Sequence, residues 1–208
     1  MKKHRFQCGA ATRLGDMGDF WVFGYGSLIW RPGFAHVETR RARLHGYRRS
    51  LCVYSFVHRG TRERPGLVLG LDRGGSCIGL AFRVPGDLRN EVITYLRERE
   101  LVTNVYLERM LSIRLDKGDT RGADKGGGEN GGETGGGETV EAVAYVVDRS
   151  HEQYAGALDA ADAASVVRGA VGQSGKNEDY VSSTLEHLEA LGIRDHWLEE
   201  VARRLAPL

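Results

Sequence analysis

The fold is decided by residues 21–30, Trp21-Val22-Phe23-Gly24-Tyr25-Gly26-Ser27-Leu28-Ile29-Trp30. Three apolar residues run directly into two glycines and a serine, which is typical of a buried strand that ends in a tight loop. Glycine accepts backbone conformations that other residues avoid, and it lets another group approach the main chain closely. Unpaired N–H groups in such a loop can bind an anion or a developing oxyanion, so we expect a functional site here.

Two other interpretations of this loop are disfavoured by its neighbours. A dinucleotide-binding fingerprint needs a third glycine where Ile29 stands, and Trp30-Arg31-Pro32 does not open a helix. A serine nucleophile would need a Gly-x-Ser-x-Gly elbow around Ser27, and no His and Asp pair has a telling spacing. On the loop alone, a plain turn between two buried segments stays open.

Composition indicates one ordinary globular domain. The chain has 208 residues, 41% of them hydrophobic and 27% charged, with a net charge of +1. This balance gives no general attraction to nucleic acid or to an anionic membrane, and no apolar run is long enough to span a bilayer. Residues 1–19 are predicted to be a loose leader, basic at the start but without the apolar core of a secretory signal.

Cysteine and histidine usage predicts neither disulfides nor a metal site. The three cysteines, Cys8, Cys52 and Cys77, form no C-x-x-C motif, and the seven histidines form no H-x-H or H-E-x-x-H motif. Cys52 and Cys77 lie in apolar, strand-like runs and are predicted to be core residues. We therefore expect a cytoplasmic protein without metal or cofactor.

The apolar pattern predicts strands in the first two thirds of the chain. Expected segments are one or two strands within 41–57 broken near Gly46, strands at 66–71 and 77–84 joined by a hairpin at 72–75, and strands at 105–115 and 139–147. Residues 116–138 are dominated by glycine and have little to bury, so they are predicted to be a disordered surface loop.

Helices are predicted after residue 85 and in the last third. Asp87 is expected to cap a helix whose apolar stripe places Glu100 at its edge and Glu98 on the opposite face. Asp159 should open a second helix, Asn177 should cap a third that runs to Gly192, and the last spans 195–205. Strands followed by helices indicate an α+β or mixed-barrel fold.

Four stretches in this order resemble the gamma-glutamylcyclotransferase superfamily, and specifically its ChaC-type, glutathione-degrading branch. They are Tyr25-Gly26-Ser27-Leu28, Arg59-Gly60-Thr61 with Arg64-Pro65-Gly66, Tyr95-Leu96-x-x-Arg99-Glu100, and Gly172-x-Ser174-Gly175-x-Asn177-x-x-Tyr180. The resemblance runs from about residue 21 to the C-terminus. It implies a single domain over 20–208 with the gamma-glutamylcyclotransferase-like fold, a small mixed β-barrel flanked by helices.

The resemblance also implies a reaction and its residues. The α-amino group of a γ-glutamyl unit attacks its own γ-carbonyl, which releases 5-oxoproline and, from glutathione, Cys-Gly. Glu100 matches the family's glutamate and would move the protons. The residues implied or expected to bind substrate are Gly24, Tyr25, Gly26, Ser27, Leu28, Ile29, Arg59 and Tyr180. Arg59 enters because an arginine near the substrate loop could hold a peptide carboxylate.

Several alternatives stay open. Without the family match, the charges around Glu100 are more typical of a solvated helix face, and Tyr180 could be a core residue. The glycine-rich segment has no family counterpart, so other γ-glutamyl amines or dipeptides are possible substrates. A non-catalytic binding module that regulates cation transport is the alternative outside enzymes. Glutathione is the expected small-molecule partner, and the sequence does not indicate an oligomeric state.

Overall fold

The structure is a computed structural model that describes residues 18–101, 103–117 and 137–206. The predicted leader before residue 18, most of the predicted loop at 116–138, and Cys8 lie outside the described residues. In the part of the chain that is described, no helix is both long and apolar enough to cross a membrane.

Five strands form a closed barrel in the order β1-β3-β2-β4-β5. They are β1 (Phe20–Gly24), β2 (Glu38–Ser55), β3 (Gly66–Val84), β4 (Tyr106–Leu115) and β5 (Thr139–Val147). Neighbouring strands are antiparallel except β1 and β5, whose short parallel pairing closes the barrel. Buried apolar side chains from all five strands fill the core, and Cys52 and Cys77 are buried among them as predicted.

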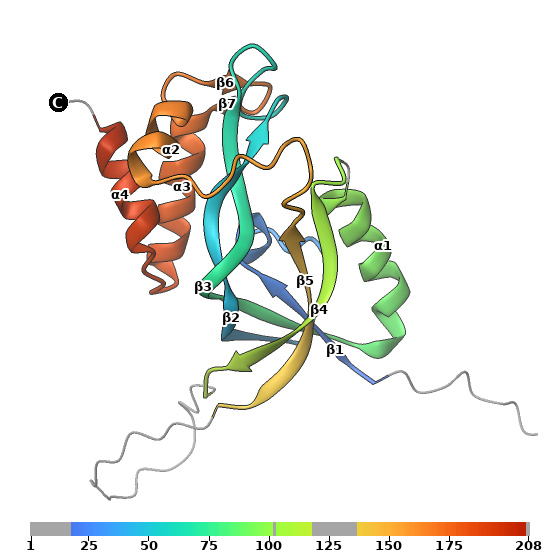
Figure 1. Cartoon of the computed structure of the whole chain (residues 1–208). Helices are drawn as coiled ribbons and strands as arrows, with labels where there is room; N and C mark the ends of the chain where they lie inside the picture. Colours follow the sequence, from blue (N-terminus) through green and yellow to red (C-terminus); the bar gives the residue numbers. More distant parts are fainter. Residues whose placement is uncertain (1–17, 102, 118–136, 207–208) are drawn as a thin grey trace, which may run out of the picture.

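Helices cover opposite sides of this barrel (Figure 1). After β1 comes the short 3-10 helix η1 (Ser27–Ile29), and after β3 come η2 (Gly86–Leu88) and α1 (Arg89–Glu100). Helices α2 (Ala160–Val167), α3 (Asn177–Ala190) and α4 (His196–Leu205) pack together on the side away from α1 (Figure 1). The predicted α+β barrel flanked by helices is confirmed.

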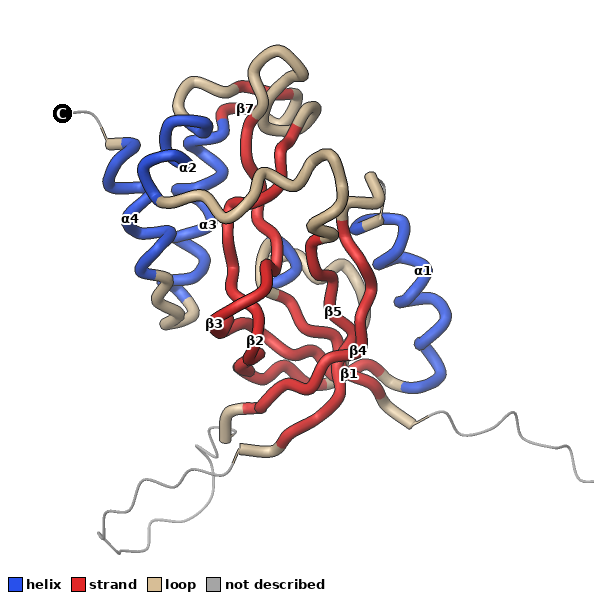
Figure 2. Tube along the Cα trace, viewed as in Figure 1, coloured by secondary structure: helices blue, strands red, loops and turns tan. Residues whose placement is uncertain are grey.

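The predicted hairpin at residues 72–75 is wrong, because β3 continues through it. β3 pairs with the one long strand β2 on both sides of Gly74 and Gly75, and the register shifts between His45 and Tyr47 and between Leu51 and Val53. Gly46, Gly74 and Gly75 have φ values of 83°, 103° and 67°, so these turn-forming residues make an irregularity inside the ladder. β2 and β3 continue side by side past this irregularity. Their connection at the far end lies next to the small ribbon of β6 (Val171–Gly172) and β7 (Gly175–Lys176) (Figure 2).

Two predicted helix caps are also wrong. Asp87 lies within η2, and α1 begins after Leu88 without a side-chain cap. Asn177 is the first residue of α3, where Lys176 holds the N-cap position. Its side chain turns instead to β3, where Oδ1 accepts from the Leu67 amide at 2.6 Å and Nδ2 donates to the Leu67 carbonyl at 2.8 Å. A sequence pattern could not show whether Asn177 caps its own helix or bonds the backbone of a distant strand.

We call these two hydrogen bonds between Asn177 and Leu67 the Asn177 clamp. The clamp is needed because one edge of β3 lacks a partner strand. β1 pairs with β3 only from Leu80 to Val84, so in the described chain no strand continues along that edge. Side chains satisfy the backbone groups there instead. The Leu69 amide donates to the Tyr180 hydroxyl at 3.2 Å, and the Tyr106 hydroxyl donates to the Leu69 carbonyl at 2.7 Å. Unpaired buried backbone groups would be costly, so these side chains stabilise the barrel.

We predict that Asn177→Ala lowers the free energy of unfolding by about 2–4 kcal/mol, because two buried backbone groups of Leu67 lose their partners. Urea denaturation at neutral pH measures the change. Glu186→Ala, at an exposed position of the same helix, is the control and should stay within about 0.5 kcal/mol of wild type. Equal midpoints for the two variants would contradict the clamp.

Candidate active site

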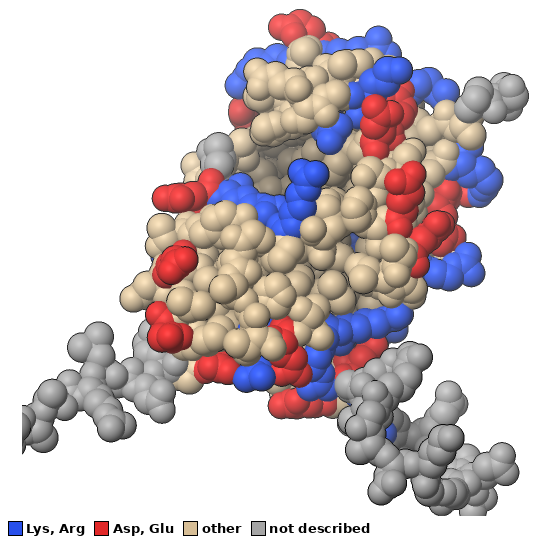
Figure 3. Space-filling view, turned by 180° about the vertical axis from the view of Figure 1, so that it is seen from behind, with Lys and Arg blue, Asp and Glu red and all other residues tan. Residues whose placement is uncertain are grey.

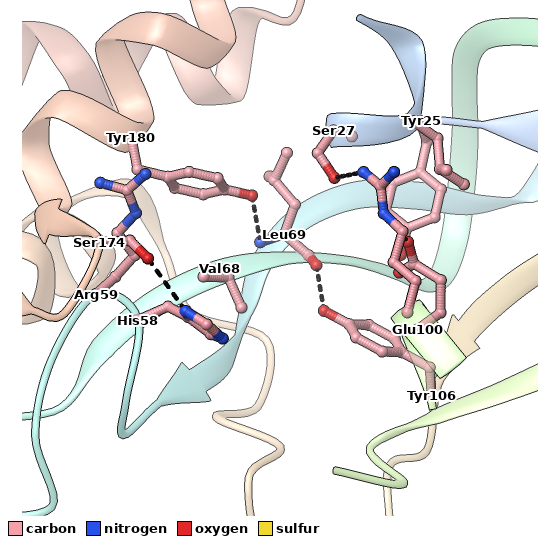
Figure 4. A pocket seen from close by; sticks show the side chains of 13 residues that line it. Tyr25, Ser27, His58, Arg59, Val68, Leu69, Glu100, Tyr106, Ser174 and Tyr180 are labelled. Atoms are coloured by element: carbon pink, nitrogen blue, oxygen red, sulfur yellow. Dashed lines mark hydrogen bonds and ion pairs between the residues drawn. The ribbon is translucent and has the colours of Figure 1, made fainter. Parts of the chain in front are cut away.

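A cavity of about 330 Å³ opens against the unpartnered edge of β3 (Figure 4). The space-filling view from behind shows a hollow on this face, with Lys and Arg side chains beside it (Figure 3). The residues lining the cavity are Tyr25, Gly26, Ser27, Leu28, His58, Arg59, Val68, Leu69, Arg99, Glu100, Tyr106, Ser174 and Tyr180. They come from the loop after β1, the connection between β2 and β3, β3 itself, the C-terminal end of α1, the start of β4, the β6–β7 turn and α3.

The loop after β1 forms one wall of the cavity. Gly26 precedes η1, and its carbonyl accepts from the Ile29 amide at 2.9 Å. Within the described chain, the amides of Gly26, Ser27 and Leu28 donate to no other group. Three residues that line the cavity therefore carry N–H donors without a partner in the described chain, and their use in binding stays a prediction.

A buried arginine fixes the start of this loop. Arg49 Nε donates to the Tyr25 carbonyl at 2.6 Å. Its other nitrogens reach the Ile78 carbonyl at 2.7 Å and Asp195 Oδ2 at 2.9 Å. The side chain is 3% exposed, so it links the loop, β3 and the start of α4 from inside the protein. Arg49 was not among the residues expected from the sequence, although a charged residue within an apolar strand was a signal for it.

Glu100 lies at the last turn of α1, with its side chain 17% exposed. Burial raises its pKa above the usual 4.5, and the Arg99 guanidinium, with Nε 3.2 Å from Oε1, lowers it in part. Val92 and Leu96 are buried on the same helix while Glu98 is exposed. The predicted half-buried position of Glu100 at the edge of the apolar stripe is confirmed.

Arg99, which the sequence analysis left without a role, ties α1 to the loop. Nη2 donates to Ser27 Oγ at 2.9 Å. Nη1 donates to the Tyr95 hydroxyl at 2.9 Å and to the Arg31 carbonyl at 2.6 Å. These bonds hold the Glu100 carboxylate beside the Ser27 loop. The only signal in the sequence was its place next to Glu100 in the Tyr-Leu-x-x-Arg-Glu segment.

Three tyrosines supply neutral hydroxyls to the cavity wall. Burial raises the pKa of Tyr180 to about 12 and holds those of Tyr25 and Tyr106 well above their usual value. Protonated phenols donate and accept hydrogen bonds without adding negative charge beside Glu100. Tyr106 had not been identified from the sequence, since nothing in β4 itself indicates that it faces a cavity.

Most of the residues expected from the sequence line this cavity, but two do not. Gly24 ends β1, where a Cβ would lie 3.1 Å from the Phe82 ring, and Ile29 belongs to the hydrophobic core. At the far end the cavity includes two residues that had not been expected to bind substrate, His58 and Ser174, whose Nδ1 and Oγ lie 3.1 Å apart. Among the described residues, His, Cys, Asp and Glu side chains form no group of three that could hold a metal ion.

Comparison with known proteins now defines the class. A family model described as ChaC-like protein matches residues 20–206. The fold is that of gamma-glutamylcyclotransferases, since a crystal structure of the yeast gamma-glutamyl cyclotransferase specific to glutathione superposes with a TM-score of 0.74 at 22% identity. It covers 90% of this chain and 96% of the yeast chain.

The chain belongs to the ChaC-like family. It is 31% identical over 186 residues to the glutathione-specific gamma-glutamylcyclotransferase of Escherichia coli (strain K12), covering 89% of this chain and 72% of that protein. It is 29% identical over 198 residues to glutathione-specific gamma-glutamylcyclotransferase 1 of Mus musculus, covering 93% of this chain and 81% of the mouse protein.

We predict that Glu100→Gln is more stable than wild type at pH 7. The folded-state pKa of Glu100 is raised, so the folded protein binds more protons than the unfolded chain between about pH 4.5 and that raised value. The free energy of unfolding therefore falls as the pH rises through this window. Glu100→Gln has no carboxylate to ionise, so it does not lose this free energy. Thermal melting from pH 4 to 8 should show that the melting temperature of Glu100→Gln exceeds that of wild type at pH 7 and that this difference becomes smaller at low pH.

Glu98→Gln, on the exposed face of the same helix, is the control for this series and should melt within a degree or two of wild type throughout. A lower melting temperature for Glu100→Gln at pH 7 would contradict the desolvation of this carboxylate.

Proposed function

We propose that this protein is a glutathione-specific gamma-glutamylcyclotransferase that converts glutathione to 5-oxoproline and Cys-Gly. The observation that carries the proposal is a desolvated carboxylate, Glu100, that lines a cavity beside the loop after β1, where the backbone amides of residues 26–28 have no partner in the described chain. The names of the E. coli and mouse relatives support glutathione as the substrate.

The reaction itself places modest demands on the protein. The attacking amine and the γ-carbonyl belong to the same molecule, and good intramolecular geometry is worth roughly 7–11 kcal/mol. One C–N bond forms to close the five-membered ring, and another C–N bond breaks to release Cys-Gly, so no water is consumed. What remains is to fold the substrate and to move two protons.

Glu100 is suited to both proton transfers. The α-amino group has a pKa of about 8, so it is mostly protonated at neutral pH and must lose a proton before it attacks. The Glu100 carboxylate takes that proton, and its raised pKa brings it closer to that of the amine. After the attack, the resulting carboxylic acid gives this proton to the leaving nitrogen. The carboxylate formed again takes the second proton from the ring nitrogen, which ends as the lactam N–H, and passes it to the released amine of Cys-Gly. One group therefore acts first as base and then as acid.

The loop after β1 stabilises charge in this scheme. As the amine attacks, the γ-carbonyl oxygen becomes negative, and the amides of Gly26, Ser27 and Leu28, which belong to residues that line the cavity and have no partner in the described chain, can donate to it. Preorganised donors of this kind are most effective in a site sheltered from water. Arg49 and Arg99 hold the loop at its two ends, so the donors need little rearrangement.

The direct test is to incubate the protein with glutathione and to quantify products by mass spectrometry. We expect 5-oxoproline and Cys-Gly in equal amounts. A γ-glutamyl amine assayed in parallel distinguishes a broader cyclotransferase, which would turn over both compounds at similar kcat/KM. Release of free glutamate would indicate hydrolysis, and release of neither product would leave a binding module; either result overturns the proposal.

Replacing Glu100 by Gln should lower kcat by roughly 10²–10⁴, because the amide keeps the shape of the side chain but cannot accept the proton. The dissociation constant for glutathione, measured by calorimetry, should stay within about tenfold, or about 1.4 kcal/mol. Glu98→Gln should retain wild-type kcat. If Glu98→Gln abolished 5-oxoproline release while Glu100→Gln spared it, the assignment of the base would be wrong.

A further inference from the structure

The cavity has two ends with different chemistry, separated by the edge of β3 (Figure 4). Tyr25, Ser27 and Glu100 lie at one end. Arg59, His58 and Ser174 lie at the other, beyond Leu69 and Val68 in the same view. A linear substrate whose reacting centre sits at Glu100 would extend its remaining residues toward the second end.

The two arginines that line the cavity differ in how their charge is used. Arg99 is ion-paired with Glu100 and donates to Ser27 and two other groups. Within the described chain, the Arg59 guanidinium donates one hydrogen bond, from Nη1 to the Lys176 carbonyl at 3.1 Å, and it lies over the Tyr180 ring at 5.3 Å. Within the described chain no carboxylate pairs with Arg59. Its remaining N–H donors are therefore available to an anion.

The backbone around Arg59 is held firmly, so the guanidinium is presented from a fixed position. The Arg59 amide donates to Ser55 Oγ at 3.0 Å. The amides of Gln173 and Ser174 donate to the carbonyls of Val57 and His58 at 2.8 and 2.9 Å. A Cβ at Gly60 would lie 2.1 Å from the Gly66 amide, so this turn is too tight for any side chain there.

We infer that Arg59 binds the terminal carboxylate of the Cys-Gly portion and makes the enzyme selective for the tripeptide over γ-glutamyl amines. The inference rests on the proposed function, which places the γ-glutamyl end at Glu100. Glutathione carries its second carboxylate at the opposite end of the molecule, where Arg59 is the arginine without an acidic partner in the described chain. A planar guanidinium suits a carboxylate through two parallel hydrogen bonds.

This contact lies away from the reacting atoms and does not change during the reaction. It should therefore strengthen ground-state and transition-state binding equally, which lowers KM without raising kcat. A residue that only supported the fold would affect substrates with and without the terminal carboxylate alike. The pair of substrates therefore separates recognition from structure.

The experiment compares wild type and Arg59→Gln on glutathione and on glutathione monoethyl ester, in which the glycine carboxylate is esterified. For glutathione, the substitution should raise KM roughly 10- to 100-fold, the usual effect of losing a hydrogen bond to a charged group, with kcat nearly unchanged. For the ester, the two proteins should have KM values within about threefold. Arg59→Lys, which keeps the charge but loses the planar fork, should fall between them on glutathione.

Arg62→Gln is the matched control. Arg62 lies exposed on the same loop over the Phe56 ring and does not line the cavity, so this variant should behave as wild type with both substrates. An equal KM increase on glutathione and on the ester for Arg59→Gln, or none on glutathione, would overturn the inference.

Binding of the terminal carboxylate by Arg59 can be tested separately from the proposed reaction. If wild type releases no 5-oxoproline from either compound, the proposed function fails, and calorimetric binding then decides on Arg59. Tighter binding of glutathione than of the ester by wild type, but not by Arg59→Gln, would support the subsite. If wild type and Arg59→Gln bound glutathione and the ester with equal affinities, the inference about Arg59 would be overturned.

Discussion

The unpartnered edge of β3 is the constraint on which the rest of this structure depends. β1 is five residues long and β3 nineteen, so the barrel closes at one end and leaves backbone groups of β3 without a strand at the other. Asn177, Tyr180 and Tyr106 satisfy those groups with their side chains. Because side chains take less room than a strand, a cavity remains beside the edge. Tyr106 and Tyr180 stabilise the barrel and line the site with the same atoms.

The charges of the site follow from this arrangement. A carboxylate at the end of α1 faces the cavity and loses much of its solvent, which raises its pKa and makes it a useful base. The same burial makes the ionised form costly, so the protein gives up stability at neutral pH for it. Arg99 limits that cost and joins the carboxylate to the loop through Ser27. Burial of Glu100 therefore favours proton transfer, because it raises the pKa of the carboxylate, and lowers stability at neutral pH, because the ionised carboxylate is costly to bury.

How much could be predicted from the sequence depended on whether the information was local. The glycine loop, the strands at β4 and β5, the opening of α2 at Asp159, the extent of α4 and the half-buried position of Glu100 all follow from short-range patterns. Gly74 and Gly75 inside β3 looked like a turn because nothing near them in the sequence shows that β2 pairs with β3 on both sides of them. The contacts of Asn177, Arg49 and Tyr106 were missed for a similar reason, since each joins residues far apart in the chain.

The central claim is that the cavity beside β3 holds a γ-glutamyl substrate with its amine at Glu100 and its γ-carbonyl at the amides after β1. The most direct measurement is a crystal structure of the Glu100→Gln variant with glutathione bound, since slow turnover preserves the substrate. The account predicts the α-amino nitrogen within hydrogen-bond distance of the residue 100 side chain and the γ-carbonyl oxygen near the amides of Gly26, Ser27 or Leu28. Glutathione bound elsewhere, or with its amine turned away from residue 100, would contradict it.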